Sequence, residues 1–544
     1  MERKAIFFII ISLILFKPAS GLTKDFFLYD HERNTIVNLN DDLQGENIKE
    51  IGLIKNPDLI MATGISDKYL AVYNSSRIKN VKGHTIFQPG SLIVFNAKPG
   101  KTGELLEIGF PPYHWTYTKD RSHFFIAYYT SPQKEQMEIL HYDVSEAKSV
   151  KVDGIKGEIL DLKLTYDEKA LLMIVNSVNH QELVAFQIGS FQPTSRLSIG
   201  FKAQQMFILG PDRAALVGFN HQGRKAGSGI IKIIDTYGSA VVEERKLTLP
   251  NSGVYWYEKN RSLFVTNGIL TGKLMKGRIY KVTGADGIRQ HQVARPWAGF
   301  SYLPQKDQVY IQNQTGLTLI DYAQNFSKTY NLSGSNYYPG RYHYYFQCLP
   351  SANLAIIVCF EKGYLTFYDL EKNQVLKNAR SGRTGERILN LLTFKGNMQS
   401  RTAATTNHDQ TRFYVLNCAT RDITVYDQGF NILKYLIPDE PPLAMFQVGQ
   451  PAMETLVVTA MGLYKIDEEE LTLIRVAEFS TVITQVKYFE ADRHSVVLYT
   501  DRLLLVLKPE NFEVKHQFYL YGDPEEKFRK LKNHERRYYF IPEL

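Results

Sequence analysis

The feature that most constrains this chain is a short ending, an aromatic or aliphatic residue followed by Asp, that recurs along it. The endings are Tyr142-Asp143, Ile234-Asp235, Ile320-Asp321, Tyr368-Asp369, Tyr426-Asp427 and Ile466-Asp467. Successive endings lie 40 to 58 residues apart, or about twice that distance. Because a period of this length is typical of repeat architectures, we expect a series of similar structural units.

Each ending closes a run with the composition of a β-strand, as in Gly-Tyr-Leu-Thr-Phe-Tyr-Asp at 363–369 and Asp-Ile-Thr-Val-Tyr-Asp at 422–427. Alternating β-branched and aromatic residues suit a half-buried pleated surface. The terminal Asp can accept a hydrogen bond from the backbone two residues on and so start a turn. The pattern therefore predicts strands that stop at the Asp.

One repeat can be laid out in full between residues 159 and 200. Strands are expected at 159–164, 170–175, 182–188 and 195–199, and four antiparallel strands in this length make a β-propeller blade. The same order fits nine further segments, of which the first carries an insertion near 75–89. These segments are 48–108, 114–152, 204–249, 253–294, 297–332, 344–379, 391–437, 443–479 and 483–519.

The two ends of the chain carry complementary halves of one more blade. Residues 528–531 and 537–541 resemble the first two strands, and 25–30 and 35–39 the last two. Joining them would remove exposed strand edges, so residues near Asp30 should pair with residues near Phe540. The prediction is an all-β propeller of about eleven four-stranded blades.

Eleven blades exceed the four to eight usual for one ring, so we expect two rings. The Gly-, Ser- and Pro-bearing segment 333–341 is the most linker-like stretch. We therefore place a provisional boundary there, with a first ring in 22–335 and a second in 336–544.

Several strand pairs resemble known repeats. Ser-Leu-Phe-Val-Thr-Asn at 262–267, and Arg-Phe-Tyr-Val-Leu-Asn at 412–417 leading to the strand at 422–427, look like YVTN-type and WD40-like β-propeller repeats. The resemblance covers nearly all of residues 24–542 and implies a propeller fold. The Gly-His and Trp-Asp pairs of WD40 blades and the Asp-box of sialidase-like propellers are absent, which leaves the subfamily open.

The first 21 residues have the composition of a signal peptide. Residues 2–4 are charged, 5–16 form an apolar run, and Ala19-Ser20-Gly21 is a small-residue cleavage site. We expect the mature chain to be secreted or lumenal, without stable membrane insertion. The net charge of +8 is spread over interspersed charges of both signs, which does not indicate nucleic-acid binding.

Cysteine and sequon content adds little constraint. The three cysteines, Cys348, Cys359 and Cys418, cannot form a disulfide framework, and we expect Cys359 and Cys418 to be a buried pair of thiols at equivalent positions. Sequons permit glycosylation without proving it. They begin at Asn74, Asn260, Asn313, Asn325 and Asn331.

The sequence lacks the common catalytic motifs: there is no nucleophile elbow, Walker-type loop or Gly-x-Gly-x-x-Gly, and His31 and His534 lack the second His of a zincin motif. The blades leave no room for a separate catalytic domain. A propeller could still bind a metal in its channel, but Asp161 stands out as the exceptional carboxylate on the presumed inner strands. We expect no cofactor and no metal site.

Aromatic residues cluster on the presumed first strands. One interpretation is packing between blades, and the other is an aromatic-lined mouth that stacks on a peptide or sugar. The residues are Trp115, Trp256, Trp297, Tyr302 and Tyr344.

Propeller function resides mostly in loops, so the insertions are candidate docking sites for a protein partner. They lie at 75–89, 221–228, 268–276 and 397–410. The sequence favours a non-catalytic protein-interaction scaffold. The alternatives are a propeller hydrolase or lactonase with a channel metal, and a carbohydrate-binding propeller.

Overall fold

The computed structural model describes most of the chain between residues 26 and 541. The described residues are 26–30, 35–39, 49–53, 57–65, 68–79, 85–96, 104–134, 136–152, 155, 157–177, 180–222, 225–237, 240–247, 251–267, 277–293, 297–313, 316–331, 344–349, 352–359, 364–380, 382, 404–417, 420–449, 453–491, 496–520 and 537–541. The predicted signal peptide lies outside them.

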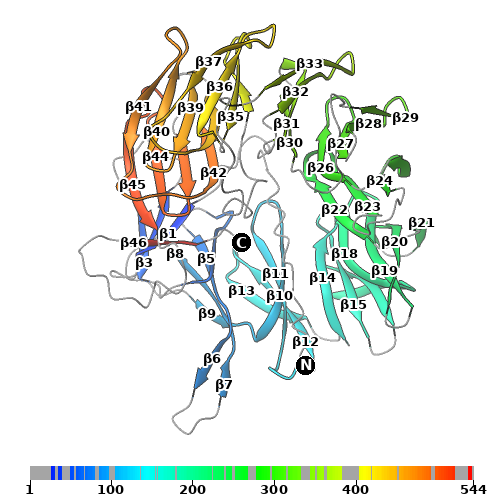
Figure 1. Cartoon of the computed structure of the whole chain (residues 1–544). Coiled ribbons are helices and arrows are strands. Elements are labelled where there is room, and N and C mark those ends of the chain that lie inside the picture. Colours follow the sequence, from blue (N-terminus) through cyan, green and yellow to red (C-terminus); the bar gives the residue numbers. More distant parts are fainter. Residues whose placement is uncertain are drawn as a thin grey trace, which may run out of the picture.

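The described residues form an all-β structure built of four-stranded antiparallel units, which confirms the predicted β-propeller fold. Nine separate four-stranded sheets accompany one eight-stranded sheet and one hairpin. In nearly all of them the strands are neighbours in chain order. The sheets follow one another around the molecule in Figure 1, from blue through cyan and green to yellow and orange.

The first three sheets are β4 (Leu59–Ala62), β5 (Lys68–Tyr73), β8 (Ser91–Asn96) and β9 (Glu104–Glu107); β10 (Phe110–Tyr117), β11 (His123–Tyr129), β12 (Met137–Asp143) and β13 (Lys148–Val152); β14 (Glu158–Leu164), β15 (Ala170–Asn176), β16 (Gln181–Gln187) and β17 (Gln192–Ser198). The next three are β18 (Lys202–Ile208), β19 (Arg213–Gln222), β20 (Lys225–Asp235) and β21 (Val241–Lys246); β22 (Asn251–Tyr257), β23 (Ser262–Asn267), β24 (Gly277–Thr283) and β25 (Gly287–Val293); β26 (Trp297–Leu303), β27 (Gln308–Asn313), β28 (Gly316–Asp321) and β29 (Phe326–Asn331). The last three are β30 (Tyr344–Leu349), β31 (Leu354–Cys359), β32 (Tyr364–Asp369) and β33 (Gln374–Arg380); β34 (Ala404–Thr406), β35 (Phe413–Asn417), β36 (Asp422–Tyr426) and β37 (Ile432–Leu436); β38 (Pro442–Gln447), β39 (Thr455–Thr459), β40 (Gly462–Asp467) and β41 (Thr472–Glu478).

The eight-stranded sheet joins the two ends of the chain. It contains β42 (Val486–Ala491), β43 (Val496–Thr500), β44 (Leu503–Leu507), β45 (Val514–Leu520), β46 (Arg537–Ile541), β1 (Phe26–Asp30), β2 (Thr35–Leu39) and β3 (Lys49–Leu53). The backbone of Asp30 pairs with Tyr538 and that of Leu28 with Phe540. The predicted closure of one blade by both termini is confirmed.

The division of strands within this closing unit differs from the prediction. Among the described residues, the C-terminal end of the chain supplies β46 and the N-terminal end supplies three strands, because β3 pairs antiparallel with β2 through Asn38 and Lys49. The next sheet therefore begins at Leu59 and not at residue 48. The expected strand at 528–531 lies outside the described residues.

Three of the four expected insertions contain strand residues. The segment 221–228 belongs to the paired ends of β19 and β20, where His221 pairs with Ala226. The segment 75–89 forms the hairpin β6 (Ser76–Lys79) and β7 (Thr85–Gln88), which projects from the body in Figure 1. The segment 397–410, expected to be a loop, includes β34, the first strand of its sheet. Ala404, Thr405 and Thr406 are all buried, which explains why this short polar run belongs to a sheet.

The hydrophobic core consists of layers between successive sheets. One cluster combines Leu172 and Ile174 of β15 with Leu216 of β19, and another combines Tyr310 of β27 with Ile357 of β31. The second cluster contains residues from both sides of the provisional boundary at 335/336. The division into two rings and the exact blade number stay predictions.

The Asp residues that first revealed the repeat do what their position predicts. Asp143, Asp235, Asp369 and Asp467 each accept a hydrogen bond at 2.8–3.0 Å from the backbone N–H two residues on. At Asp427 the donor is the N–H of Asn431, at 2.7 Å. These bonds hold the turn between the third and fourth strands.

Candidate functional site

Three of the predicted aromatic site residues have described side chains, and each lies in a separate aromatic contact. The Trp115 ring is 6.1 Å from that of Tyr113, and the Trp256 ring is 5.5 Å from that of Phe207. Both tryptophans are half-buried against the apolar layers between sheets. The structure does not bring them together into one described surface.

Tyr302 is buried and hydrogen-bonded. Its ring lies 5.0 Å from that of Tyr257, its hydroxyl accepts from Asn260 Nδ2 at 2.7 Å, and it donates to Asp307 Oδ1 at 2.9 Å. Burial and the bond to Asp307 raise the pKa of Tyr302. For Trp297 and Tyr344 the structure describes the backbone alone, at the starts of β26 and β30.

The described sequon residues are exposed. Asn74 donates its backbone N–H to Asp58, Asn325 occupies a left-handed turn with φ of 53°, and the Asn260 side-chain nitrogen is bonded to Tyr302. The side chains of Asn313 and Asn331, at the ends of β27 and β29, lie outside the described set.

Asp161, the carboxylate singled out in the sequence, connects two neighbouring inner strands. Its Oδ1 accepts the N–H of Leu162 and its Oδ2 accepts that of Met206 on β18, both at 2.8 Å. Burial raises its pKa, and Lys163 and the backbone bonds counteract this. Among the described residues, no group of three or more His, Cys, Asp or Glu side chains could hold a metal ion.

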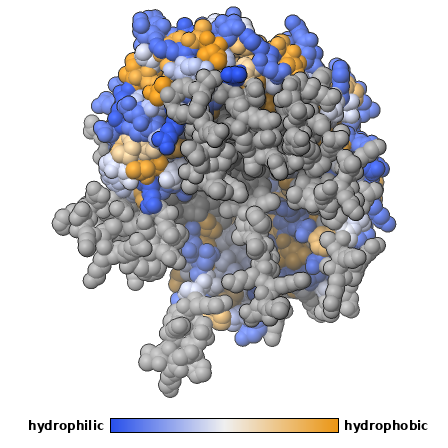
Figure 2. All heavy atoms as spheres, viewed as in Figure 1, coloured by the Kyte–Doolittle hydropathy of each residue, from blue (hydrophilic) through white to orange (hydrophobic). Residues whose placement is uncertain are grey.

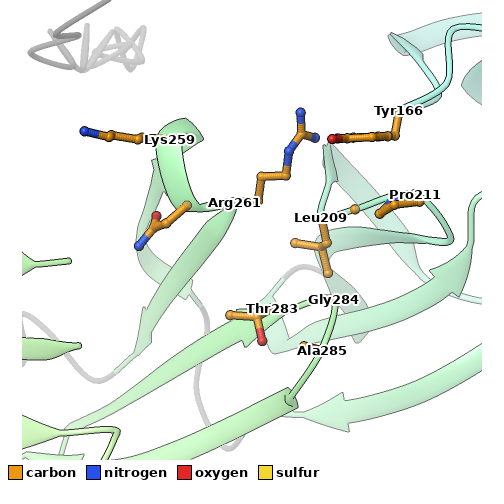
Figure 3. A pocket seen from close by; sticks show the side chains of 10 residues that line it. Tyr166, Leu209, Pro211, Lys259, Arg261, Thr283, Gly284 and Ala285 are labelled. Atoms are coloured by element: carbon orange, nitrogen blue, oxygen red, sulfur yellow. The ribbon is translucent and has the colours of Figure 1, made fainter. Parts of the chain in front are cut away.

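A pocket of about 340 Å³ lies where turns from three successive sheets meet, as Figure 3 shows. Its wall includes two cationic residues and no acidic one. The lining residues are Tyr166, Leu209, Gly210, Pro211, Lys259, Asn260, Arg261, Thr283, Gly284 and Ala285.

Arg261 is the central side chain of this pocket. It follows the short 3-10 turn η1 (Glu258–Asn260) in a left-handed conformation, and its Nη1 donates to the Ile208 carbonyl of the preceding sheet at 3.2 Å. Its guanidinium lies 4.4 Å from the centre of the Tyr166 ring, toward which it points in Figure 3. Lys119 Nζ lies 4.7 Å from the same ring centre. Tyr166 is therefore flanked by two cations.

This pocket was not predicted from the sequence, although a repeated tetrapeptide could have revealed it. Lys119-Asp120-Arg121-Ser122 and Lys259-Asn260-Arg261-Ser262 occupy the same turn in two sheets. Arg121 and Arg261 are both in the left-handed conformation, and both donate to a carbonyl of the preceding sheet. The arginine thus has the same structural role in both sheets, because it bonds each sheet to the preceding one. At Arg261 the same side chain also lines the pocket.

A second candidate surface lies on the outermost strands of three successive sheets. We call Val375, Leu376, Ile432, Leu433 and Ile474, on β33, β37 and β41, the rim surface; each is 36–46% exposed. A bulge in each of β33 and β37 places two residues opposite one partner, which explains why two consecutive apolar side chains are exposed there. Figure 2 shows apolar and hydrophilic residues side by side over this part of the molecule.

A basic residue follows the exposed apolar residues on each of these three strands. Its side chain bonds to the neighbouring sheet or to its own sheet. Lys377 Nζ donates to the Gly429 carbonyl and to Asn431 Oδ1, and Lys434 Nζ donates to the Glu470 carbonyl. Arg475 pairs with Glu440 at 2.7 Å. These three basic side chains therefore make contacts within the protein, whereas the apolar side chains beside them are exposed.

Comparison with known proteins finds similar solved structures but no matching family. No protein-family model matches the sequence, and no curated protein matches it. Similar solved structures include the C-terminal WD40 domain of Sif2, with 12% identity over 69% of this chain and 94% of that domain and a TM-score of 0.28. The β-propeller domain of the trilobed protease from Pyrococcus furiosus has 11% identity over 62% of this chain and 99% of that chain, with a TM-score of 0.30.

The similar structures also include enzymes. A catalytically inactive virginiamycin B lyase from Staphylococcus aureus shares 11% identity over 55% of this chain and 96% of that chain, with a TM-score of 0.30. No helix in the described part of the chain is long and apolar enough to cross a membrane.

Proposed function

We propose that this protein is an extracytoplasmic β-propeller scaffold that binds a protein partner and carries out no chemistry of its own. The observation that supports this most directly is the rim surface, with exposed apolar pairs at equivalent positions of β33 and β37. The location outside the cytosol rests on the composition of residues 1–21.

Exposed apolar pairs are costly unless something covers them. Burial of a Val, Leu or Ile side chain is worth about 1.5–3 kcal/mol, and exposed apolar patches on soluble proteins commonly mark interaction sites. Repetition over successive sheets argues for one extended contact. Each of the described strands β33, β37 and β41 also pairs on one side only, so a partner would meet an open strand edge.

The test replaces Leu376 and Leu433 by Ser in one variant. Wild-type and variant proteins, crosslinked in the native host, are purified and their bound proteins quantified by mass spectrometry. We expect a defined partner to be lost from the double variant with the melting temperature unchanged, because both side chains are exposed. Val242→Ser, an exposed bulge residue of β21, is the matched control and should retain the partner.

A crosslinked partner set identical in wild-type, double-variant and control proteins would contradict the proposal. So would turnover of a substrate by the purified chain, which would favour the enzymatic alternative.

A further inference from the structure

We propose that the pocket around Arg261 is a binding site for a carboxylate side chain of an acidic protein segment. That the ligand is a protein rests on the proposed scaffold function. That the ligand is anionic rests on the pocket alone. The pocket and the rim surface share no residue, so the two are tested separately.

The charge of the pocket wall selects an anion. Lys259 and Arg261 belong to the lining and no acidic residue does. Arg261 spends one N–H on the Ile208 carbonyl, and a guanidinium has five donors. Within the described residues no ion-pair partner is recorded for either cation. Lys259 points away from Tyr166 in Figure 3, so we assign it to attracting the ligand and Arg261 to binding it.

The geometry favours a carboxylate over a doubly charged phosphate. A planar guanidinium held on an aromatic face presents its remaining N–H groups in the fork that matches a carboxylate. Contact with the Tyr166 ring at 4.4 Å fixes that plane, and the bond to Ile208 fixes one edge. One guanidinium suits one negative charge.

The surroundings favour a protein ligand. Tyr166 and Tyr237 are both substantially exposed, at 38% and 50%, and the Tyr237 hydroxyl donates to Asp167 Oδ2 at 3.0 Å, beside Tyr166 in sequence. Tyr and Arg are among the residue types that contribute most to binding energy at protein–protein interfaces, and here an exposed Tyr lies next to an Arg. An extended segment could contact both tyrosines and place one acidic side chain at Arg261.

Gly210 offers a way to test the site without removing Arg261. A side chain added at Gly210 would meet no atom within 4 Å, and its φ is not in the left-handed range. Gly210→Asp therefore introduces a negative charge into the pocket wall with little strain. Gly449, in the equivalent turn of the sheet β38–β41, is also open, so Gly449→Asp is the matched control.

The experiment measures binding of a fluorescein-labelled peptide of alternating Glu and Ala to the full chain by fluorescence anisotropy, at low and high salt. We expect Gly210→Asp and Arg261→Ala to weaken binding about 10-fold, the loss of one charge-assisted contact, and Gly449→Asp to leave it unchanged. Arg261→Ala also removes a contact between sheets, so thermal denaturation must show that each variant is folded.

Equal affinity of wild-type and Gly210→Asp proteins for the peptide would overturn the proposal. So would competition by inorganic phosphate or heparin that exceeds competition by free glutamate peptide, since the ligand would then be a phosphate or a sulfated polysaccharide. A negative result here with partner loss in the rim variant would reject the pocket and retain the scaffold.

Discussion

His141 is a buried histidine whose surroundings disfavour its charge. Its ring lies 4.7 Å from that of Phe125 and 5.0 Å from that of Phe191, and its Nε2 is 3.2 Å from His123 Nδ1. Burial, reinforced by repulsion from His123, lowers the pKa of His141 to about 4 from an ordinary 6.5, although Asp143 acts in the opposite direction. The folded state therefore holds this ring neutral.

This shift makes folding stability depend on pH. The unfolded chain takes up a proton on His141 at higher pH than the folded chain, so stability is full above about 6.5, falls as pH drops toward about 4 and then levels off. The loss should be about 3–3.5 kcal/mol, at about 1.4 kcal/mol per pKa unit. Urea denaturation at several pH values between those limits would measure it.

His141→Gln is the control, because Gln does not titrate in this range. The variant should lack this part of the pH dependence; the same slope in both proteins would show that another group is responsible.

At the scale of single residues, the sequence predicted the turn Asp side chains because each acts on backbone two to four positions away. It predicted neither the role of Asp161, whose second partner Met206 is 45 residues on, nor the Arg261 pocket. Contacts between sheets join residues about one repeat apart. A local sequence pattern cannot predict these contacts unless the pattern recurs in several repeats, as the Lys-Asp/Asn-Arg-Ser tetrapeptide does.

At the scale of strands, short apolar runs predicted most second and third strands well because these strands are buried on both faces. The fourth strands are largely exposed, and their bulges break the alternation that a regular strand would show. The assignment of residues 48–53 to the following blade was wrong for a related reason. Strand β3 alternates like any first strand, and only its pairing with β2 assigns it to the closing unit.

The basic residue after each apolar pair should stabilise the contact between neighbouring sheets. Lys377→Ala removes two hydrogen bonds from β33 to the turn before β37, at 3.1 and 2.6 Å. We expect a loss of about 0.5–1.5 kcal/mol in the free energy of unfolding. Both acceptors are uncharged, but the pKa of Asp427 is lowered by hydrogen bonds from Asn431 and also by the charge of Lys377, so a minor part of the loss should be screened by salt.

Thermal and urea denaturation at two salt concentrations would measure this loss and its salt dependence. Urea is used because guanidinium chloride is itself a salt. Lys372→Ala, an exposed lysine of the adjacent turn, is the control and should have no measurable effect. A strong salt dependence of the Lys377→Ala effect would point to an ion pair instead.

At the scale of the whole molecule, the pairing of β1 with β46 should control cooperativity. Deleting residues 537–544 removes the strand that pairs with Phe27 to Asp30. The exposed edge of β1 should then lower the melting temperature and reduce hydrogen-exchange protection of the β1 amides that face β46, while the amides bonded to β2 stay protected.

The shorter deletion of residues 542–544 keeps β46 and is the control. Hydrogen exchange read by mass spectrometry would distinguish the two truncations; unchanged protection of β1 in the longer one would mean that the pairing contributes nothing to stability.

Because the two termini share one sheet, this sheet cannot be completed until synthesis of the chain is nearly finished. Asp30 is made early, but its partner Tyr538 follows only after some 500 further residues, which takes roughly 25–100 s at usual elongation rates. Throughout that interval the first strands are complete and lack their neighbour. A chain built in this way must keep its earliest strands from pairing elsewhere until its last ones arrive.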